Sequence, residues 1–400
     1  MRLLIATHQF EIFAGSELHT ADLCRGFRRA GHEVAMFTLK PGPATGILGN
    51  IPVFSLAELR SLREENFDLI YLHHATCEVV LGLVFSGKVP IIRGYLGVIP
   101  AQEKPTNARF LSGEVYLSEE VAEQNYADRH ADVPSSIARS VYDDQLITPI
   151  VAHTEPALGA PNFAVVSNHL DRDLAAILEA AAAEDLCRFT HFGWPNNNLA
   201  ITTKLLTPFD AVITIGRTVL LTAALGKPVY ICDVHGADGW LTRDNFARSQ
   251  SRNFSGRAFG IKDWTFVRRH LLDTNQWPSL NDLTWLRGSV ERHHSLSRRV
   301  EQLEGFFADV IGKAPPPMPI PGGYEGVLQF LEQKDRALQA LGRIERRRLK
   351  DAIKEARDEA RAQAERKKER NRRVQELKQQ VVKLKRQIEE LESRNRHLES

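Results

Sequence analysis

Short apolar runs and amphipathic stretches alternate from the start of the chain. RLLIAT and VAMFTL, within residues 1–40, are apolar runs of strand length, and the apolar residues between them recur at helical spacing up to Gly31. A strand, a helix and a second strand form a βαβ unit, whose crossover makes the two strands parallel. The pattern therefore predicts a parallel sheet at the beginning of the chain.

The same alternation continues to residue 120 and starts again near residue 160. It predicts further strands at 67–74, 89–97, 113–120, 162–170, 186–193, 209–216 and 227–233, helices at 171–185 and 217–226, and one or two closing helices at 285–312. Such repetition predicts the α/β fold class with two doubly wound, Rossmann-like domains. The weakly periodic, proline-containing segment 141–160 separates the two series, so we expect domains at 1–150 and 151–312.

Prolines and glycines then end the α/β pattern. Residues 313–330 include PPPMPIPGG, which predicts a stiff linker to a helical tail at 331–400. In this tail two rows of residues repeat every seven positions: Val374, Val381, Ile388 and Asn395, and Leu377, Leu384, Leu391 and Leu398. β-Branched residues in one row and leucine in the other favour a parallel two-stranded coiled coil, whose register a single Asn fixes. The pattern predicts a long C-terminal α-helix that forms a homodimer through 374–398. The alternative is one amphipathic helix that docks on its own body.

Composition excludes several classes of protein. Apolar residues are 43% and charged residues 26% of the 400 residues, which is average for globular chains and excludes a wholly disordered or collagen-like protein. The sequence has no apolar run long enough to span a membrane. The cysteines Cys24, Cys77, Cys187 and Cys232 are far apart and form no CxxC pair, so we expect neither a disulfide framework nor a zinc site. These features favour a reducing, cytoplasmic location.

The net charge of +2 hides an uneven distribution of charge. Residues 343–400 carry 20 Lys and Arg against 12 Asp and Glu, a charge of +8, so the first 342 residues carry −6. The basic tail is either a solvated helix face or a weak contact with anionic lipid, which would place the protein at the inner face of the membrane. Residues 331–400 have no aromatic residue on which bases could stack, so we expect no nucleic-acid partner.

Glycine and polar residues follow the predicted strands at the edge where doubly wound domains bind ligands. After the first strand, Gly15, Ser16 and Glu17 either contact a ligand or cap the next helix. Later, the turn 216–218 combines a glycine, a guanidinium and a helix N-terminus, which suits a diphosphate. The alternative for this turn is a helix cap with a surface arginine.

Carboxylates and a histidine add further candidates. The glycine-rich loop 232–246 offers Asp233 and Asp238 for the hydroxyls of a sugar or a ribose, at a spacing that does not fit a metal site. His74, at the carboxyl end of the strand 67–74, is placed either to line a cleft or to be a buried structural histidine.

The segments AGSELHTADLCRGFRRAGHEV, FDLIYLHH, VYLSEEVAE and GRTVLLTAALGKPVYICD stand in a specific order. In that order they resemble the retaining glycosyltransferases of family 4, which have the GT-B fold. Ala14-Gly15-Ser16-Glu17 is similar to the family's GGxE-like loop, and the segment from Gly216 onward is similar to its nucleotide-sugar loop. The resemblance covers residues 1–312.

The chain departs from the family at its charged positions. Where the family has an Arg and a Lys after the first donor-domain strand, this chain has Asn168, and where it has a Glu-x7-Glu pair, this chain has Thr214 and Thr222. Threonine bonds without charge, and charge-assisted bonds are roughly twice as strong. Arg217 is the expected replacement for the missing cation. The departures imply either altered donor recognition or lost transfer activity.

The resemblance implies a retaining, hexosyltransferase-like enzyme. It would move a sugar from a nucleotide diphosphate-sugar to an acceptor hydroxyl on a glycan or lipid-linked acceptor, in bacterial polysaccharide or glycoconjugate synthesis, with no bound cofactor or metal. Donor-binding residues would be Gly216, Arg217, Thr218, Thr222, Asn168, Asp233 and Asp238, and acceptor-side residues Gly15, Ser16, Glu17 and His74. The alternative is a catalytically degenerate GT-B scaffold that acts in protein interaction through its coiled coil.

Overall fold

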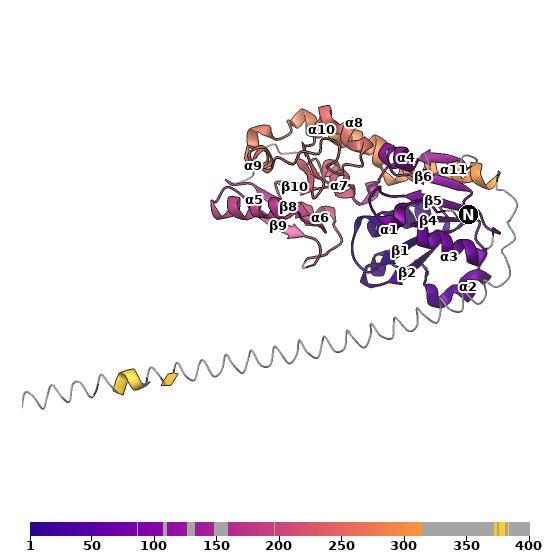
Figure 1. Cartoon of the computed structure of the whole chain (residues 1–400), viewed down its shortest axis with the longest axis horizontal. Helices are drawn as coiled ribbons and strands as arrows, with labels where there is room; N and C mark the ends of the chain where they lie inside the picture. Colours follow the sequence, from indigo (N-terminus) through magenta and orange to yellow (C-terminus); the bar gives the residue numbers. More distant parts are fainter. Residues whose placement is uncertain are drawn as a thin grey trace, which may run out of the picture. The chain divides into compact units, whose positions relative to one another are not determined.

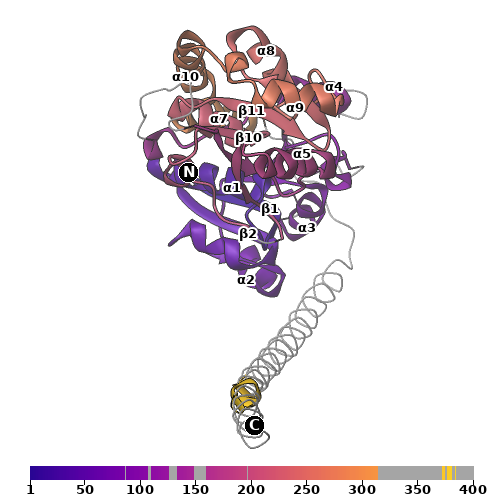
Figure 2. The same ribbon diagram turned by 90° about the vertical axis from the view of Figure 1, so that its left-hand side faces the viewer.

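A computed structural model describes most of the chain before residue 314. The described residues are 1–85, 87–106, 110–125, 133–147, 159–195 and 197–313, with 372–373, 376–380 and 383 in the tail. The chain divides into two compact units, Met1–Glu332 and Gln333–Ser400. The first unit contains two sheets, whose elements gather into two lobes in Figures 1 and 2, from indigo to purple and from magenta to orange.

The first lobe is built on a seven-stranded sheet in the order β3-β2-β1-β4-β5-β6-β7. Its strands are β1 (Arg2–Phe10), β2 (Glu33–Pro41), β3 (Val53–Phe54), β4 (Leu69–His73), β5 (Ile91–Tyr95), β6 (Gly113–Tyr116) and β7 (Ser135–Ile137), and its helices are α1 (Gly15–Arg29), α2 (Leu59–Glu64), α3 (Ala75–Phe85) and α4 (Glu119–Asn125). All of its neighbouring strands pair in parallel, as the βαβ pattern predicts. The order is that of a Rossmann sheet with an added strand.

The second lobe is built on a five-stranded sheet in the order β12-β11-β10-β8-β9. Its strands are β8 (Asn162–Val166), β9 (Arg188–Phe192), β10 (Ala211–Thr214), β11 (Val229–Asp233) and β12 (Gly236–Trp240), and its helices are α5 (Arg172–Ala183), α6 (Thr203–Leu206), α7 (Arg217–Leu225), α8 (Arg243–Ser251), α9 (Trp264–Leu272) and α10 (Leu280–His294). Four of the strands are parallel, which confirms the α/β class.

The sheet of the second lobe differs from the prediction at its edge. Part of the segment expected as a loop at 232–246 is the strand β12, which pairs antiparallel with β11. Gly236 and Gly239 have positive φ angles of 121° and 81°, which allow the tight return of the chain. Ala237 and Trp240 are buried, so the strand has an apolar face despite its glycines and aspartate.

The closing helical segment divides into α10 and α11 (Leu296–Ile311), which are separated by an extended Ser295. α11 returns to the first lobe, where Phe307 stacks on Phe27 of α1 with ring centroids 5.5 Å apart. Figure 1 shows the orange α11 among the purple elements. The division into domains at 1–150 and 151–312 remains a prediction. α11 lies within 151–312 in sequence but packs on the first lobe.

Two stretches of chain cross between the lobes side by side. Tyr142 donates its N–H to the carbonyl of His294 at 3.1 Å, and Leu296 donates to the carbonyl of Tyr142 at 3.0 Å. This crossing falls within the predicted segment 141–160, of which residues 148–158 lie outside the described ones.

The tail predictions are mostly untested by the structure. Apart from residue 313, the linker 313–330 lies outside the described residues, as does most of 331–400. The described tail residues are helical, and Leu377 is 55% exposed within the single chain. The coiled coil at 374–398 therefore stays a prediction. Within the described residues, no helix is long and apolar enough to cross a membrane.

Candidate functional site

A cavity of about 310 Å³ lies between the two lobes at the carboxyl ends of their strands. Parallel strands bring the loops that follow them to one edge, so residues far apart in sequence meet there. The first lobe contributes residues 13–16 after β1, together with Leu18 and His19 of α1. The second lobe contributes residues 166–169 after β8, Gly193 after β9, residues 214–218 after β10 and Asp233 at the end of β11. The size of the cavity is at the lower end of the range for small-molecule sites.

The predicted turn at the start of α7 forms one wall of this cavity. Gly216 is the N-cap residue with φ of 60°, and a Cβ at this position would meet no atom within 4 Å. Arg217 follows with a side chain that is only 11% exposed, so it is not a surface arginine. Thr218 also lines the cavity. The structure thus places the three predicted residues together.

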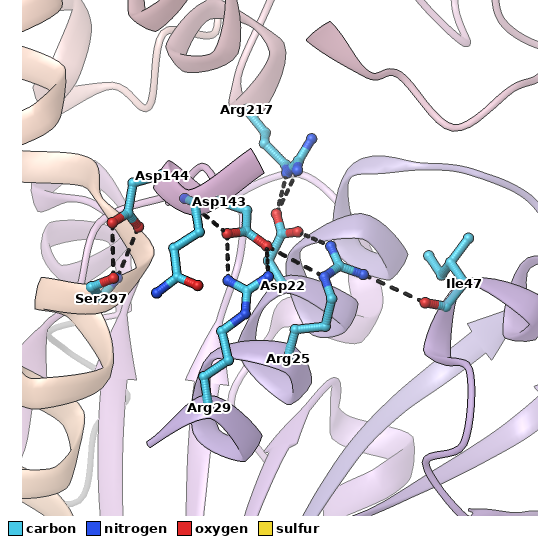
Figure 3. Close-up of polar contacts among 9 residues, drawn as sticks. Asp22, Arg25, Arg29, Ile47, Asp143, Asp144, Arg217 and Ser297 are labelled. Atoms are coloured by element: carbon cyan, nitrogen blue, oxygen red, sulfur yellow. Dashed lines mark hydrogen bonds and ion pairs between the residues drawn. The ribbon is translucent and has the colours of Figure 1, made fainter. Parts of the chain in front are cut away.

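Arg217 faces the first lobe and forms an ion pair with Asp22 of α1 (Figure 3). Its Nε and Nη2 atoms both lie 2.6 Å from Asp22 Oδ2, and within the described part of the chain its Nη1 atom has no hydrogen-bond partner. The Asp22 carboxylate is fully buried. The guanidinium therefore lines the cavity while it is bound by a carboxylate of the opposite lobe.

Asp22 is itself part of a chain of ion pairs. Its Oδ1 atom accepts from Arg25 Nη2, and Arg25 Nε lies 3.5 Å from Asp143 Oδ2. Arg29 clamps Asp143 with both terminal nitrogens, at 2.5 and 2.9 Å. Asp143 belongs to the crossing segment, so the network links this segment to the cavity wall.

A second bridge between the lobes is built from two asparagines and a backbone group. Asn198 accepts from the Phe13 N–H at 2.8 Å and donates to the Phe13 carbonyl at 2.9 Å. Asn168 donates to the same carbonyl at 3.2 Å and accepts from Trp194 N–H and Asn198 Nδ2. Asn168, which we predicted to bind the donor, lines the cavity, and its amide also holds the loop after β1.

The two aspartates predicted to bind the donor, Asp233 and Asp238, lie in different surroundings. Asp233 lines the cavity, where its Oδ1 accepts from Ser167 Oγ and Val234 N–H, and burial raises the pKa of its carboxyl. Asp238 is buried in β12 and accepts from Phe259 N–H at 3.0 Å, away from the residues that line the cavity.

The two threonines at the Glu-x7-Glu positions also differ. Thr214 lines the cavity and donates its hydroxyl to the Val166 carbonyl at 2.9 Å. Thr222 is buried inside α7, where its hydroxyl donates to the Thr218 carbonyl one turn earlier. Its hydroxyl is therefore satisfied within the helix, and Thr222 is not among the cavity-lining residues.

On the first lobe, Gly15 and Ser16 line the cavity. The capping alternative does not describe this helix, because its N-cap residue is Ala14 and no side chain caps it. Glu17 turns into the protein, where it is fully buried and accepts from Ser16 Oγ at 2.7 Å. Burial raises the pKa of the Glu17 carboxyl, although its hydrogen bonds oppose the shift.

His74 has the contacts of a structural histidine. Its Nδ1 atom accepts from His8 N–H at 3.1 Å, so the proton must lie on Nε2, which faces Glu103 Oε1 at 3.3 Å. His74 is buried with a positive φ of 73° and is not among the cavity-lining residues. Our expectation that it would line the acceptor side was therefore not met, since Nδ1 is bound by the neighbouring strand β1 and Nε2 faces Glu103 in the 3-10 helix Ala101–Glu103.

His19 and Asp22 are site residues that sequence analysis missed. Both lie on α1, three positions apart, so they share one face of the helix. A polar pair at this spacing among buried residues could have indicated that this face contributes to a site. Burial, and then the neighbouring His73 and Arg217, hold the pKa of His19 well below its usual range, so its imidazole is neutral. The sequence does not say which helix face meets the cavity, because that depends on how the second lobe is placed.

Comparisons with known proteins show the fold. No family model and no curated protein matches the sequence. The chain is similar to two solved structures of the Anabaena protein HepE, one with UDP and one with UDP and glucose. Both are 15% identical with a TM-score of 0.52, and they cover 77% of this chain and 100% and 99% of the other. It is also similar to the apo form of the lipopolysaccharide outer core galactosyltransferase WaaB, at 12% identity and a TM-score of 0.51, over 77% and 100% of the two chains. These are GT-B structures, so the chain has the GT-B fold.

The arrangement favours binding of an anionic ligand that also carries hydroxyl groups. A helix start and a guanidinium attract phosphate, and Asp233 with Ser167 accepts and donates hydrogen bonds in the same cavity. Among the described residues, no group of His, Cys, Asp or Glu is arranged to hold a metal ion.

Proposed function

We propose that this protein is a glycosyltransferase that moves a sugar from a nucleotide diphosphate-sugar to an acceptor hydroxyl. One observation carries the proposal: Gly216, Arg217 and the start of α7 line an interlobe cavity at the carboxyl ends of the strands in a GT-B fold. In such sheets ligands bind at this edge, and a helix N-terminus with an adjacent arginine is suited to a diphosphate.

The ligands of similar structures support a uridine diphosphate-sugar as donor. HepE was solved with UDP and with UDP and glucose, and WaaB is described as a galactosyltransferase. At these identities the likeness shows the fold alone, so the donor remains part of the proposal.

Catalysis would come from stabilisation of the leaving nucleotide diphosphate. Negative charge develops on the diphosphate as the bond to the sugar breaks, and preorganised positive groups that face it lower the barrier. Arg217 and the N–H groups at the start of α7 would supply these charges. Asp233, Ser167 and Thr214 would contact hydroxyls of the sugar or the ribose, in place of the absent glutamates. We assign the acceptor to the side of Gly15 and Ser16.

The finer assignments rest on the sequence. We propose a retaining, hexosyltransferase-like reaction in polysaccharide or glycoconjugate synthesis, with a glycan or lipid-linked acceptor. The tail would join two such enzymes through 374–398, and its basic residues would touch anionic lipid at the inner face of the membrane. The charge of +8 on residues 343–400 supports the contact with lipid, and the heptad pattern of 374–398 supports the pairing.

Nucleotide binding tests the proposal directly. Titration calorimetry with UDP, GDP and TDP should give heat with at least one of them. Arg217→Ala should then weaken binding by about 10- to 100-fold, the scale of a lost hydrogen bond to a charged group. Arg268→Ala is the matched control, because this arginine of the second lobe forms an exposed ion pair with Glu184. Nucleotide binding by this variant should not change.

If none of the three nucleotides binds, the proposed function is wrong. If binding occurs but ignores Arg217→Ala, the site is misplaced.

A further inference from the structure

The ion-pair network beside the cavity contains more guanidinium groups than carboxylates. Among the described residues, Arg25 and Arg217 share Asp22, and Arg25 and Arg29 share Asp143 (Figure 3). Asp144, the next carboxylate along the chain, instead accepts from the backbone N–H and the hydroxyl of Ser297. The contacting groups thus carry three positive and two negative charges.

Arg217 can leave the network without leaving a buried carboxylate unpaired. Without it, Arg25 still pairs with Asp22 Oδ1, and Arg29 still clamps Asp143 through two bonds. A buried carboxylate that loses its only partner is strongly destabilising, but Asp22 would keep one. Release of Arg217 leaves two arginines on two aspartates and one free positive charge at the cavity wall.

We propose that Asp22 occupies Arg217 in place of the donor's diphosphate, and that the diphosphate displaces Asp22 when the donor binds. This inference rests on the proposed function. A carboxylate and a phosphate both offer oxygen atoms that fit the fork of a guanidinium, so one can substitute for the other. Asp22 is then an internal competitor that lowers the affinity of the empty enzyme for nucleotide diphosphates. The ligand class is a diphosphate carried on a nucleoside.

The exchange has a consequence for the two lobes. Asp22 belongs to the first lobe and Arg217 to the second, so donor binding would remove one ion pair between them. Another pair between the lobes remains, in which Arg257 Nε and Nη2 bind Glu120 at 3.0 and 2.7 Å. The second pair offers a matched control, since it also joins an arginine of the second lobe to a carboxylate of the first.

Asp22→Asn in the full-length chain tests the competition. Asparagine keeps the shape of the side chain but removes its charge, so Arg217 is held less tightly. The Kd for UDP measured by calorimetry should fall by about threefold or more, because a larger fraction of the protein is competent to bind. Glu120→Gln should change it by less than about twofold. A smaller fall for Asp22→Asn, or a rise, overturns the proposal, and a rise would show that Asp22 positions Arg217 for the ligand.

Two further measurements separate this inference from the proposed function. In an Arg217→Ala background, Asp22→Asn should have no effect on the Kd for UDP, since its action passes through Arg217; an equal gain in that background overturns the proposal. If wild type binds UDP and Arg217→Ala weakens it, the proposed site stands whatever Asp22→Asn does. Should Asp22→Asn fail to fold, a crystal structure of the wild type with UDP decides: Arg217 on the diphosphate supports the exchange, and Arg217 still on Asp22 overturns it.

Discussion

Individual polar side chains on α1 determine much of the chemistry at the cavity. Glu17, His19 and Asp22 are all buried on one helix, yet each is held in a different way. Asp22 is paired with two arginines, His19 is neutral, and Glu17 accepts from its neighbour Ser16. Burial of polar groups is costly without partners, and Asp22 and Glu17 each have one.

The buried Glu17 predicts an unusual dependence of stability on pH. Because burial raises its pKa in the folded protein, the unfolded chain ionises at a lower pH than the folded one. At a pH below the pKa of Glu17 in the unfolded chain, the carboxyl is protonated in both the folded and the unfolded protein and does not affect the free energy of unfolding. As the pH rises, the carboxyl ionises first in the unfolded chain, which lowers the free energy of unfolding. Glu17→Gln should therefore have a higher Tm than wild type at pH 7.5, and the difference should vanish near about pH 4.

Thermal unfolding from pH 4 to 8 checks this prediction. Glu301→Gln, which changes an exposed glutamate on α11, serves as the control and should follow the wild-type pH profile. A Glu17→Gln variant that is less stable than wild type at pH 7.5 would show that the ionised carboxylate is stabilised in the fold.

At the scale of elements, the contact between α1 and α11 attaches the end of the body to its beginning. Gly26 lies where the two helices touch, because a Cβ at this position would come within 2.7 Å of Val300 Cγ2 and 2.9 Å of a Leu296 methyl. A glycine in a helix interior usually costs up to about 1 kcal/mol relative to alanine. Here the close approach of the helices requires it.

Two glycine substitutions should therefore have opposite effects. Gly26→Ala should destabilise the protein by about 1–3 kcal/mol, because the branched Val300 has little freedom to move aside. Gly305→Ala on α11, with no atom within 4 Å of its added Cβ, should stabilise it by up to about 1 kcal/mol. Urea denaturation of both variants measures the difference. Combining Gly26→Ala with Val300→Ala should cost less than the two changes added together, and full additivity would argue against the contact.

At the scale of the whole molecule, the proposed coiled coil predicts the oligomeric state. The full chain should sediment as a dimer, and Leu384→Asp should convert it to a monomer by placing a charge in the apolar seam. Arg386→Asp is the control, because this residue lies at the outermost heptad position and the dimer should persist. Sedimentation velocity reports both. A wild-type monomer would favour the alternative, in which the amphipathic tail helix docks on its own body.

Contacts between the two lobes cannot be predicted from the sequence. The Arg217–Asp22 pair, the Arg257–Glu120 pair and the asparagine bridge to Phe13 join residues that are 195, 137 and 185 positions apart. Nothing along the chain indicates which of these residues will pair with which. Their pairing depends on how the two sheets face each other.

The sequence was enough to predict the α/β class, the parallel strands and the turn at Gly216, since apolar periodicity and glycine positions are local properties of the chain. It also placed Gly15 and Ser16 at the ligand-binding edge of one predicted sheet, and Arg217, Thr218 and Asp233 at that of the other, because loops after parallel strands share an edge. The structure joins the two sets in one cavity. Three features could be seen only in the folded chain: α11 packs on the first lobe, His74 and Thr222 are internal, and Arg217 binds Asp22. These outcomes depend on which face of each element meets another, and that choice is made by packing between distant segments.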